Sequence, residues 1–421
     1  MGAPDMAAGA VRSGLAALAA AMSLAGAAAA ETIHPWVVLG PDGAAVVRTA
    51  TTDASCPRIR YDDFDRPMQV RVGPWQDYPH TVCEAPLPAI VRNVSFAGRA
   101  VPVPRPDPQR IVILGDTGCR IRGGFAQACN DPREWPFARL AATAAALKPD
   151  IVIHVGDYHY RESPCPQPSA GCEGSPYGYN WPTWRADFFE PAAPLLAAAP
   201  WVMVRGNHED CRRAGHGWYR YLEPRARPVD CEAFTAPYRV TLGDFNLVVL
   251  DTAHALDQRP PQPLVDRYRP QIEAARALAT PGSWLLAHHP LYAVFRFDGP
   301  ERRPVETNAT LLAAAEGLGP DPFPVVFSGH IHRFDVFRFA GPRPSQVIVG
   351  GGGTAVDGAL GDGPPSYAIA GMEVAERVSE KGFLFLLLER DGAGWRATLH
   401  DVDGGTVRRC RLDGRNFTCP Q

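Results

Sequence analysis

Five short apolar runs in this chain are each followed, most of them directly, by a phrase rich in Asp, Asn, Tyr and His. Apolar runs of three or four residues are typical of buried strands. Open α/β sheets place their active sites where strands end and loops begin, so the phrases are expected to meet at such an edge. The five phrases are Gly115-Asp116-Thr117-Gly118, Gly156-Asp157-Tyr158-His159-Tyr160, Gly206-Asn207-His208-Glu209, His288-His289-Pro290 and Gly329-His330-Ile331-His332.

Each phrase alone has an ordinary structural explanation. A Gly-Asp pair after a strand is common in turns, where the Asp caps the next helix. A single His after a buried strand is more often a hydrogen-bonded structural residue than a ligand. Five phrases in a fixed order, all at strand ends, instead favour a site that combines carboxylate, phenol, amide and imidazole ligands. That combination is suited to holding two metal ions side by side.

The ordered set resembles the metallophosphoesterase, or calcineurin-like phosphoesterase, superfamily from about Ile111 to Gly353. Two details resemble its purple acid phosphatase branch. Many relatives have a His two residues after the first Asp, where this chain has Gly118, and Tyr160 follows Asp157 with the spacing Gly-Asp-x-x-Tyr. The last phrase continues as Arg333-Phe334-Asp335, where these phosphatases usually have an aromatic-Glu-Arg run. The resemblance therefore leaves substrate selection open.

The resemblance implies a ligand set for two metal ions. Because His288 and His289 are adjacent, either can be the ligand, and the family pattern selects His288, two residues before Pro290. Asp157 would bridge both ions. The remaining ligands would be Asp116, Tyr160 and His332 for the first ion, and Asn207, His288 and His330 for the second.

The donor chemistry indicates which ions these are. The first site would have two carboxylates, one of them shared, and a phenol that ionises on binding, which favours iron(III). The second site shares one carboxylate and otherwise has neutral ligands, which suits a divalent ion such as zinc, iron(II) or manganese. Two ions about 4 Å apart can hold a phosphoryl group and activate a bound hydroxide as the nucleophile.

Other residues are candidates for contact with the substrate. By resemblance, His208 would stabilise the phosphoryl oxygens or protonate the leaving alcohol, and the alternative is that it orients a metal ligand. Arg120 and Arg205 flank the phrases and are candidates to pair with phosphate oxygens, although arginines near loops commonly face water or bind carboxylates. His159, between two motif residues, is a candidate pocket residue.

The first thirty residues are typical of a secretory signal. Arg12 precedes an Ala/Leu-rich stretch from Ser13 to Ala27, and small residues come before Glu31. We expect a mature protein that begins near Glu31, is secreted or periplasmic, and has no stable membrane insertion after cleavage. An uncleaved signal anchor is the alternative.

The cysteine and charge content agree with export and exclude some partners. Ten cysteines without a Cys-x-x-Cys motif favour disulfides over a zinc cluster. Pairing neighbours in order is the simplest arrangement, although the sequence does not fix it. The net charge of -3, without a basic run, gives no indication of a nucleic-acid surface. The sequence leaves the oligomeric state open.

The pattern along the chain predicts a layered α/β sandwich of metallophosphoesterase type with a small N-terminal β domain. Helices are expected at 136–147, 265–278 and 308–315, alternating with strands. The expected divisions are a signal peptide (1–30), a small β-rich domain (31–100), a Pro-rich linker (101–108), the catalytic domain (109–400) and a C-terminal tail with a disulfide (401–421).

These observations together predict a secreted enzyme with two metal ions that hydrolyses phosphomonoesters of small molecules, in the manner of an acid phosphatase. A phosphodiesterase or phospholipase on the same metal centre is an alternative, since specificity lies in the loops. A non-catalytic metal-binding scaffold is a third reading, which would be indicated by loss of a ligand or of His208. This chain retains the whole ligand set and His208.

Overall fold

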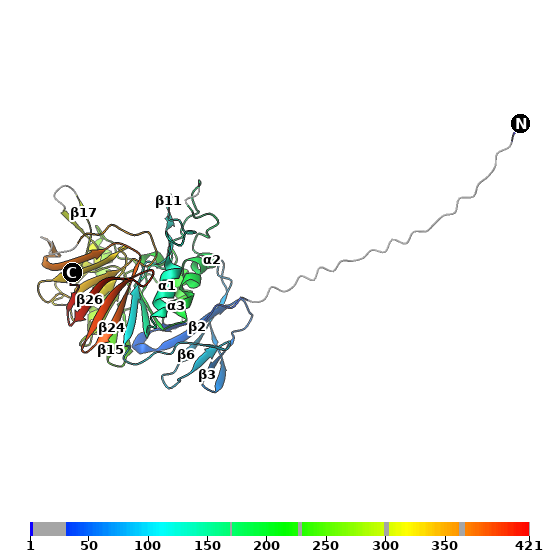
Figure 1. The fold of residues 1–421 in the computed structure, drawn as a ribbon, viewed down its shortest axis with the longest axis horizontal. Helices are drawn as coiled ribbons and strands as arrows, with labels where there is room; N and C mark the ends of the chain where they lie inside the picture. The colour runs from blue at the N-terminus through cyan, green and yellow to red at the C-terminus, as the bar shows by residue number, and fades with distance from the viewer. Residues whose placement is uncertain (3–30, 169–170, 226–229, 299–302, 362–366, 421) are drawn as a thin grey trace. The chain divides into compact units, whose positions relative to one another are not determined.

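Two large β-sheets form the centre of the structure (Figure 1). The computed structural model describes residues 1–2, 31–168, 171–225, 230–298, 303–361 and 367–420. The first sheet has eleven strands in the order β27 (Asn416–Thr418), β26 (Thr406–Asp413), β25 (Gly394–Asp401), β24 (Leu384–Asp391), β9 (Arg110–Leu114), β12 (Ile151–His154), β13 (Trp201–Met203), β1 (Trp36–Leu39), β2 (Ala45–Thr51), β6 (Thr81–Leu87) and β5 (Gln69–Val72). The second has eight, in the order β14 (Tyr238–Leu242), β15 (Phe245–Leu250), β16 (Trp284–Ala287), β19 (Val325–Ser328), β21 (Ser345–Val349), β20 (Phe334–Phe339), β23 (Met372–Glu380) and β22 (Ala368–Ile369).

Smaller sheets and short helices complete the described part of the chain. A four-stranded sheet runs β4 (Phe64–Pro67), β3 (Arg58–Tyr61), β7 (Val94–Phe96) and β8 (Arg99–Ala100), and two hairpins pair β10 (Ile121–Arg122) with β11 (Phe125–Ala126) and β17 (Val294–Asp298) with β18 (Arg303–Glu306). The helices are α1 (Phe137–Ala146), α2 (Trp181–Trp184), a π-helical turn η2 (Arg185–Phe189), α3 (Glu190–Leu196), α4 (Gly215–Tyr221), α5 (Gln262–Ala277) and α6 (Ala309–Ala315), with 3-10 turns η1 (Pro41–Gly43) and η3 (Asn207–Glu209).

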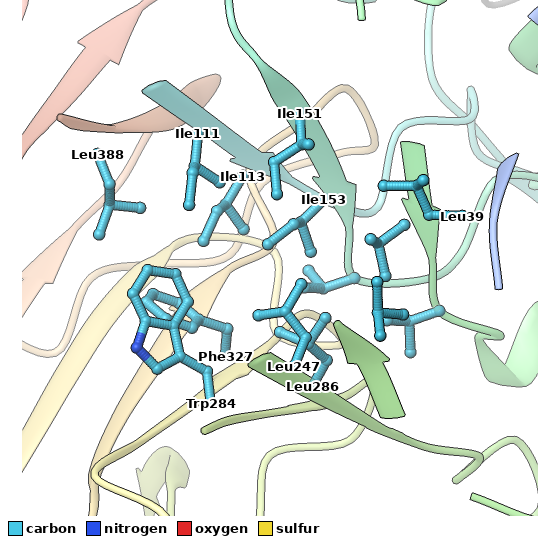
Figure 2. Packing of buried hydrophobic residues seen from close by; sticks show 14 of the residues in the cluster. Leu39, Ile111, Ile113, Ile151, Ile153, Leu247, Trp284, Leu286, Phe327 and Leu388 are labelled. Atoms are coloured by element: carbon cyan, nitrogen blue, oxygen red, sulfur yellow. The ribbon is translucent and has the colours of Figure 1, made fainter. Parts of the chain in front are cut away.

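The two large sheets pack face to face. Because side chains alternate along a strand, Ile111 and Ile113 of β9 turn towards the second sheet, where Trp284, Leu286 and Phe327 meet them (Figure 2). The alternate residues face outwards and are covered by helices: α1, α3 and α4 pack on the first sheet, and α5 and α6 on the second. The architecture is therefore helix, sheet, sheet, helix, which confirms the predicted layered α/β sandwich.

The strands that lead to the motif phrases run parallel. β9, β12 and β13 are parallel neighbours in the first sheet, and β15, β16, β19 and β21 are parallel neighbours in the second. Parallel strands end at the same edge of a sheet, so their carboxyl ends gather the loops that follow. Continuous apolar runs are what a parallel strand buried on both faces requires.

The three predicted helices are confirmed as α1, α5 and α6. Asn308 caps α6, because its side-chain oxygen accepts a hydrogen bond from the Leu311 amide at 3.1 Å. Two helical segments were not predicted from the sequence: the continuous one from α2 through α3, and α4. The segment from α2 through α3 contains Pro182, Pro191 and Pro194, which obscure a helical pattern.

The N-terminal β-rich segment is shared between two sheets. Its β3, β4, β7 and β8 form the small antiparallel sheet, whereas β1 pairs in parallel with β13 of the first large sheet. Its Ile59 and Phe96 also belong to the core between the large sheets. The residues from Glu31 onward group into one compact unit. The expected Pro-rich linker at 101–108, between a β-rich domain and a catalytic domain, stays a prediction.

Five disulfides join neighbouring cysteines in order, as the simplest pairing predicted. They are Cys56–Cys83, Cys119–Cys129, Cys165–Cys172, Cys211–Cys231 and Cys410–Cys419. Five disulfides indicate an extracytoplasmic protein. The predicted signal lies almost wholly outside the described residues. Within the described part of the chain, no helix has the length and apolar character needed to cross a membrane.

The core between the sheets gives a stability prediction. Trp284 is 3% exposed and its ring packs against Phe245, Phe327 and Trp395. Trp284→Ala should lower the free energy of unfolding by about 3–5 kcal/mol, because it removes buried area and leaves a cavity. Chemical denaturation measures the change. Phe64→Ala is the control, because Phe64 is 71% exposed and its loss should change stability by no more than about 0.5 kcal/mol. Equal effects of the two substitutions would contradict the predicted packing.

Candidate metal centre

The five phrases meet at the carboxyl ends of the parallel strands of both sheets. Asp116 follows β9, Asp157 follows β12 and Asn207 follows β13, while His288 and His330 follow β16 and β19. Side-chain ligand atoms of Asp116, Asp157 and His288 all lie within 4.8 Å of one another. The structure therefore brings together residues that are far apart in the sequence.

The first group of candidate ligands surrounds the hydroxyl of Tyr160. This oxygen lies 3.0 Å from Asp116 Oδ1, 2.9 Å from Asp157 Oδ2 and 3.1 Å from His332 Nε2. His332 Nδ1 donates to the carbonyl of Ala355 at 3.0 Å, so a neutral ring has its lone pair on Nε2. One phenol proton cannot serve three acceptors. A bound cation would satisfy all of these oxygen and nitrogen atoms together.

The second group of candidate ligands also brings acceptor atoms together with too few protons between them. His288 Nδ1 donates to the carbonyl of Val155 at 2.9 Å, and His330 Nε2 contacts Asp257 Oδ2 at 2.9 Å. Their other ring nitrogens lie 3.0 and 3.1 Å from Asn207 Oδ1, and His288 Nε2 lies 3.2 Å from Asp157 Oδ2. In the neutral form that binds a metal, both imidazoles direct lone pairs at an oxygen acceptor. A cation among them resolves this repulsion, so these residues fit a metal ion.

Burial and nearby negative charge disfavour the ionised forms of Asp116 and Tyr160 when no cation is bound. Burial and the neighbouring charge of Asp157 raise the pKa of Asp116 well above its ordinary value. Burial, followed by the charges of Asp116 and Asp157, raises the pKa of Tyr160. A metal ion reverses this effect, because it stabilises the ionised forms.

Two buried carboxylates hold the motif loops in place. Glu209 accepts hydrogen bonds from the amides of Asp157, Tyr158, His159 and Gly206 at 2.9–3.2 Å. Asp187 accepts from the amides of Cys119, Tyr160 and Arg161 at 2.8–3.0 Å and from the Arg161 side chain at 2.7 Å. Both carboxylates are fully buried. They join loops from different strands and so fix the spacing of the candidate ligands.

The backbone at the site is tightly constrained. Asp116, Asp157 and His330 have φ angles of 57°, 59° and 71°, which non-glycine residues rarely adopt and which concentrate at functional sites. A Cβ on Gly206 would lie 2.1 Å from Asp157 Oδ1. A Cβ on Gly118 would lie 2.7 Å from the Tyr158 carbonyl, so the His that many relatives have at that position would not fit this loop.

His208 lies beside the candidate ligands and is held from behind by Glu162. Its Nδ1 is 2.9 Å from Glu162 Oε1 and 2.9 Å from the His159 carbonyl, and its ring centroid is 3.9 Å from that of Tyr160. Burial raises the pKa of Glu162, but the hydrogen bond and charge of His208 and the charge of Arg213 outweigh it and lower the value to about 2. The other ring nitrogen of His208, Nε2, lies 3.8 Å from Asp157 Oδ2, beyond hydrogen-bond distance.

A cavity of about 410 Å³ lies over the cluster. Its floor is formed by the candidate residues Asp157, Asn207, His208, His330 and His332. Arg120 and Arg122 form part of the wall, and the β17–β18 hairpin contributes Phe295 and Glu306. Arg122 pairs with Glu162 at 3.1 Å, whereas the Arg120 guanidinium has no ion pair within the described part of the chain and lies 5.6 Å from the centre of the Phe125 ring.

The structure does not bring all of the predicted substrate residues to this cavity. Arg120 lines it, but Arg205 is 2% exposed and ion-pairs with Asp251 at 3.2 Å. Arg205 also donates to the carbonyl of Glu209 at 2.8 Å, which gives it a role in holding the loop. His159 is fully buried, and its Nε2 contacts the carbonyl of Gly178 at 3.0 Å.

Sequence reasoning missed four carboxylates at or behind the site. Glu162 lies two residues after Tyr160 in the same loop, and this nearness was the available signal. Asp187, Asp257 and Asp357 come from segments without a motif. Asp357 lines the cavity and accepts a hydrogen bond from the His332 amide at 2.9 Å. His289, next to His288, is buried with its ring 4.1 Å from that of His330, and its Nδ1 has no hydrogen-bond partner in the described part. The geometry around Asn207 and Asp157 instead favours His288.

Comparison with known proteins identifies the family. The profile of the calcineurin-like phosphoesterase family matches residues 109–334, which is more than half of the chain. The chain therefore belongs to the calcineurin-like phosphoesterase family. No curated protein matches the sequence.

Two solved structures have a similar fold. The purple acid phosphatase PPD1 from yellow lupin (Lupinus luteus) seeds is 15% identical with a TM-score of 0.59, and the match covers 89% of this chain and 73% of that one. The structure of PhoD is 11% identical with a TM-score of 0.50, covering 93% of this chain and 91% of that one. At these identities the likeness is one of fold. The family and the buried Asp/His cluster together indicate a metallophosphoesterase with a metal site.

The position of Asp157 between both groups gives a prediction about metal content. Asp157→Ala should lose both ions, because one carboxylate contacts both ligand groups. Elemental analysis after dialysis measures the ions per chain. Asp63→Ala, at an exposed position, is the matched control and should keep the wild-type metal content. An Asp157→Ala protein that retains two ions per chain would rule out the bridging role.

Proposed function

We propose that this chain is a secreted phosphomonoesterase with iron(III) in the first site and a divalent ion in the second. The observation that carries the proposal is the position of the Tyr160 hydroxyl, within 3.1 Å of Asp116, Asp157 and His332. Two carboxylates and a phenol supply hard anionic oxygens, which favour a ferric ion. Asn207, His288 and His330 offer neutral donors suited to zinc, iron(II) or manganese.

The chain's own residues have distinct roles in this proposal. When bound, the two ions would supply Lewis-acid polarisation of the phosphoryl group and a nucleophile at or below neutral pH. Arg120 is available for non-bridging phosphoryl oxygens, because it lines the cavity and, unlike Arg122 with its partner Glu162, has no ion pair in the described part of the chain. His208 acts in this proposal as the imidazolium: its Nδ1 proton is held by Glu162 and the His159 carbonyl, and its Nε2 proton passes to the leaving alcohol, which leaves a neutral ring.

The disulfides support the secreted part of the proposal. Five disulfides require an oxidising compartment to form and persist. Three of them lie in or beside the motif segments: Cys119–Cys129 next to Arg120, Cys165–Cys172 after Glu162, and Cys211–Cys231 after His208.

Hydrolysis of a panel of phosphomonoesters and phosphodiesters by the metal-loaded protein tests the substrate class. Preference for diesters would replace the monoesterase proposal with the alternative on the same centre.

Tyr160→Phe gives the sharpest test of the first site. A phenolate bound to iron(III) transfers charge to the metal under visible light, so the purified protein should be coloured. Tyr160→Phe should remove that absorption band and weaken iron binding while the fold is retained, because it deletes a single oxygen. Tyr158→Phe is the control, since Tyr158 is equally buried but its hydroxyl contacts the carbonyl of Val204. A colourless, fully loaded and active wild-type protein would contradict the iron(III) assignment.

His208→Ala tests proton donation. The substitution should leave both ions bound and lower kcat roughly 10²–10⁴-fold for alkyl phosphates, as for other general acids. The loss should be smaller for nitrophenyl phosphate, whose leaving group needs little protonation. Steady-state kinetics on both substrates measure the difference, and equal losses would contradict the role of His208 as proton donor.

A further inference from the structure

Asp257 contacts the second group of candidate ligands from outside the motif phrases. It lies in the loop after β15, and its Oδ2 is 2.9 Å from His330 Nε2. His288 and His332 each direct the corresponding ring nitrogen at a backbone carbonyl, at 2.9 and 3.0 Å. His330 is therefore held by a carboxylate at hydrogen-bond distance, whereas the carboxylate nearest His332 Nδ1, that of Asp357, lies 3.9 Å away.

The carboxylate of Asp257 is itself held by the start of α6. Its Oδ1 accepts a hydrogen bond from the Asn308 amide at 3.1 Å, and its main-chain carbonyl accepts from the Ala309 amide at 3.0 Å. The Asn308 side chain donates to the carbonyl of Pro290 at 3.2 Å. Asp257 is thereby connected, through α6, to the loop that carries His288. A side chain fixed in this way can set the orientation of an imidazole.

We propose that Asp257 is a positioning residue that prepares His330 to bind the divalent ion. The Nε2 proton of His330 is directed at Asp257, which leaves the Nδ1 lone pair facing Asn207 Oδ1 at 3.1 Å. A carboxylate behind a ligating imidazole fixes its tautomer and strengthens it as a donor, and loss of such a partner typically weakens metal binding 10–100-fold. The inference rests on the proposed function, because it assumes that the second site binds a divalent ion.

Asp257 also faces the cavity, with 42% of its side chain exposed. A different role would be to attract a cationic group on the substrate. The two roles predict different measurements: positioning changes the affinity for the metal ion, whereas attraction of substrate changes KM at full metal occupancy. Glu306→Gln is a matched control for charge, since Glu306 lines the same cavity but contacts the amide of Ala370 at 3.0 Å.

The test measures the dissociation constant of the divalent ion in the iron-loaded protein, by competition with a chelator, for wild type, Asp257→Asn and Glu306→Gln. We expect Asp257→Asn to weaken binding about 10–100-fold and Glu306→Gln to change it less than about twofold. At saturating divalent ion, Asp257→Asn should recover most of kcat without a rise in KM for nitrophenyl phosphate. If Asp257→Asn does not fold, Asp257→Ser replaces it, because its hydroxyl can still accept from the Asn308 amide but is too short to reach His330.

Wild-type affinity in Asp257→Asn, or an equal loss in Glu306→Gln, would overturn the proposal. A KM effect confined to substrates with a cationic group, with metal affinity unchanged, would assign Asp257 to the substrate instead and would also overturn it. Failure of the wild-type protein to bind a second ion would contradict the proposed function itself. The proposed function survives if the wild type binds two ions and only the effect of Asp257→Asn is missing.

Discussion

The structure of the site depends on oxygen and nitrogen lone pairs that face one another at hydrogen-bond distance. There are too few protons for every one of these contacts to be a hydrogen bond. Around Tyr160, one phenol proton faces three acceptors, and around Asn207 two imidazole nitrogens are directed at an oxygen. Such a cluster is costly when buried, because each unpaired polar atom has lost its hydration. A pair of cations would offset this cost. The same arrangement that destabilises the cluster alone therefore favours binding of two metal ions.

The rest of the fold keeps this cluster from relaxing. The two sheets bring five parallel strands to one edge, and Glu209 and Asp187 tie their loops together through backbone amides. Asp116, Asp157 and His330 retain left-handed backbone conformations in this frame. Glycine at position 206 allows the third loop to approach Asp157 closely, because a Cβ there would collide with its carboxylate. Precision at the site thus comes from buried hydrogen bonds in the loops as well as from the sheets.

Much of this arrangement was predictable from the sequence, because the candidate ligands follow apolar runs in a fixed order. The runs predict strands, and the strand ends place Asp116, Asp157 and Asn207 together. The roles of Asp187 and Asp257 were not predictable in this way. Their segments contain no motif, and their contacts depend on how distant loops cross. For Arg205, position in the sequence was a poor guide. Its place near Asn207 suggested substrate contact, whereas its guanidinium is directed at Asp251 and at backbone carbonyls.

The most direct test of the two-metal account is a crystal structure of the metal-loaded protein with anomalous diffraction measured at the iron and zinc absorption edges. The account predicts two anomalous peaks about 3.5–4 Å apart, with Asp157 between them, Tyr160 on the iron and Asn207 on the second ion. A single peak, or a second peak bound through His289 in place of His288 and Asn207, would contradict it.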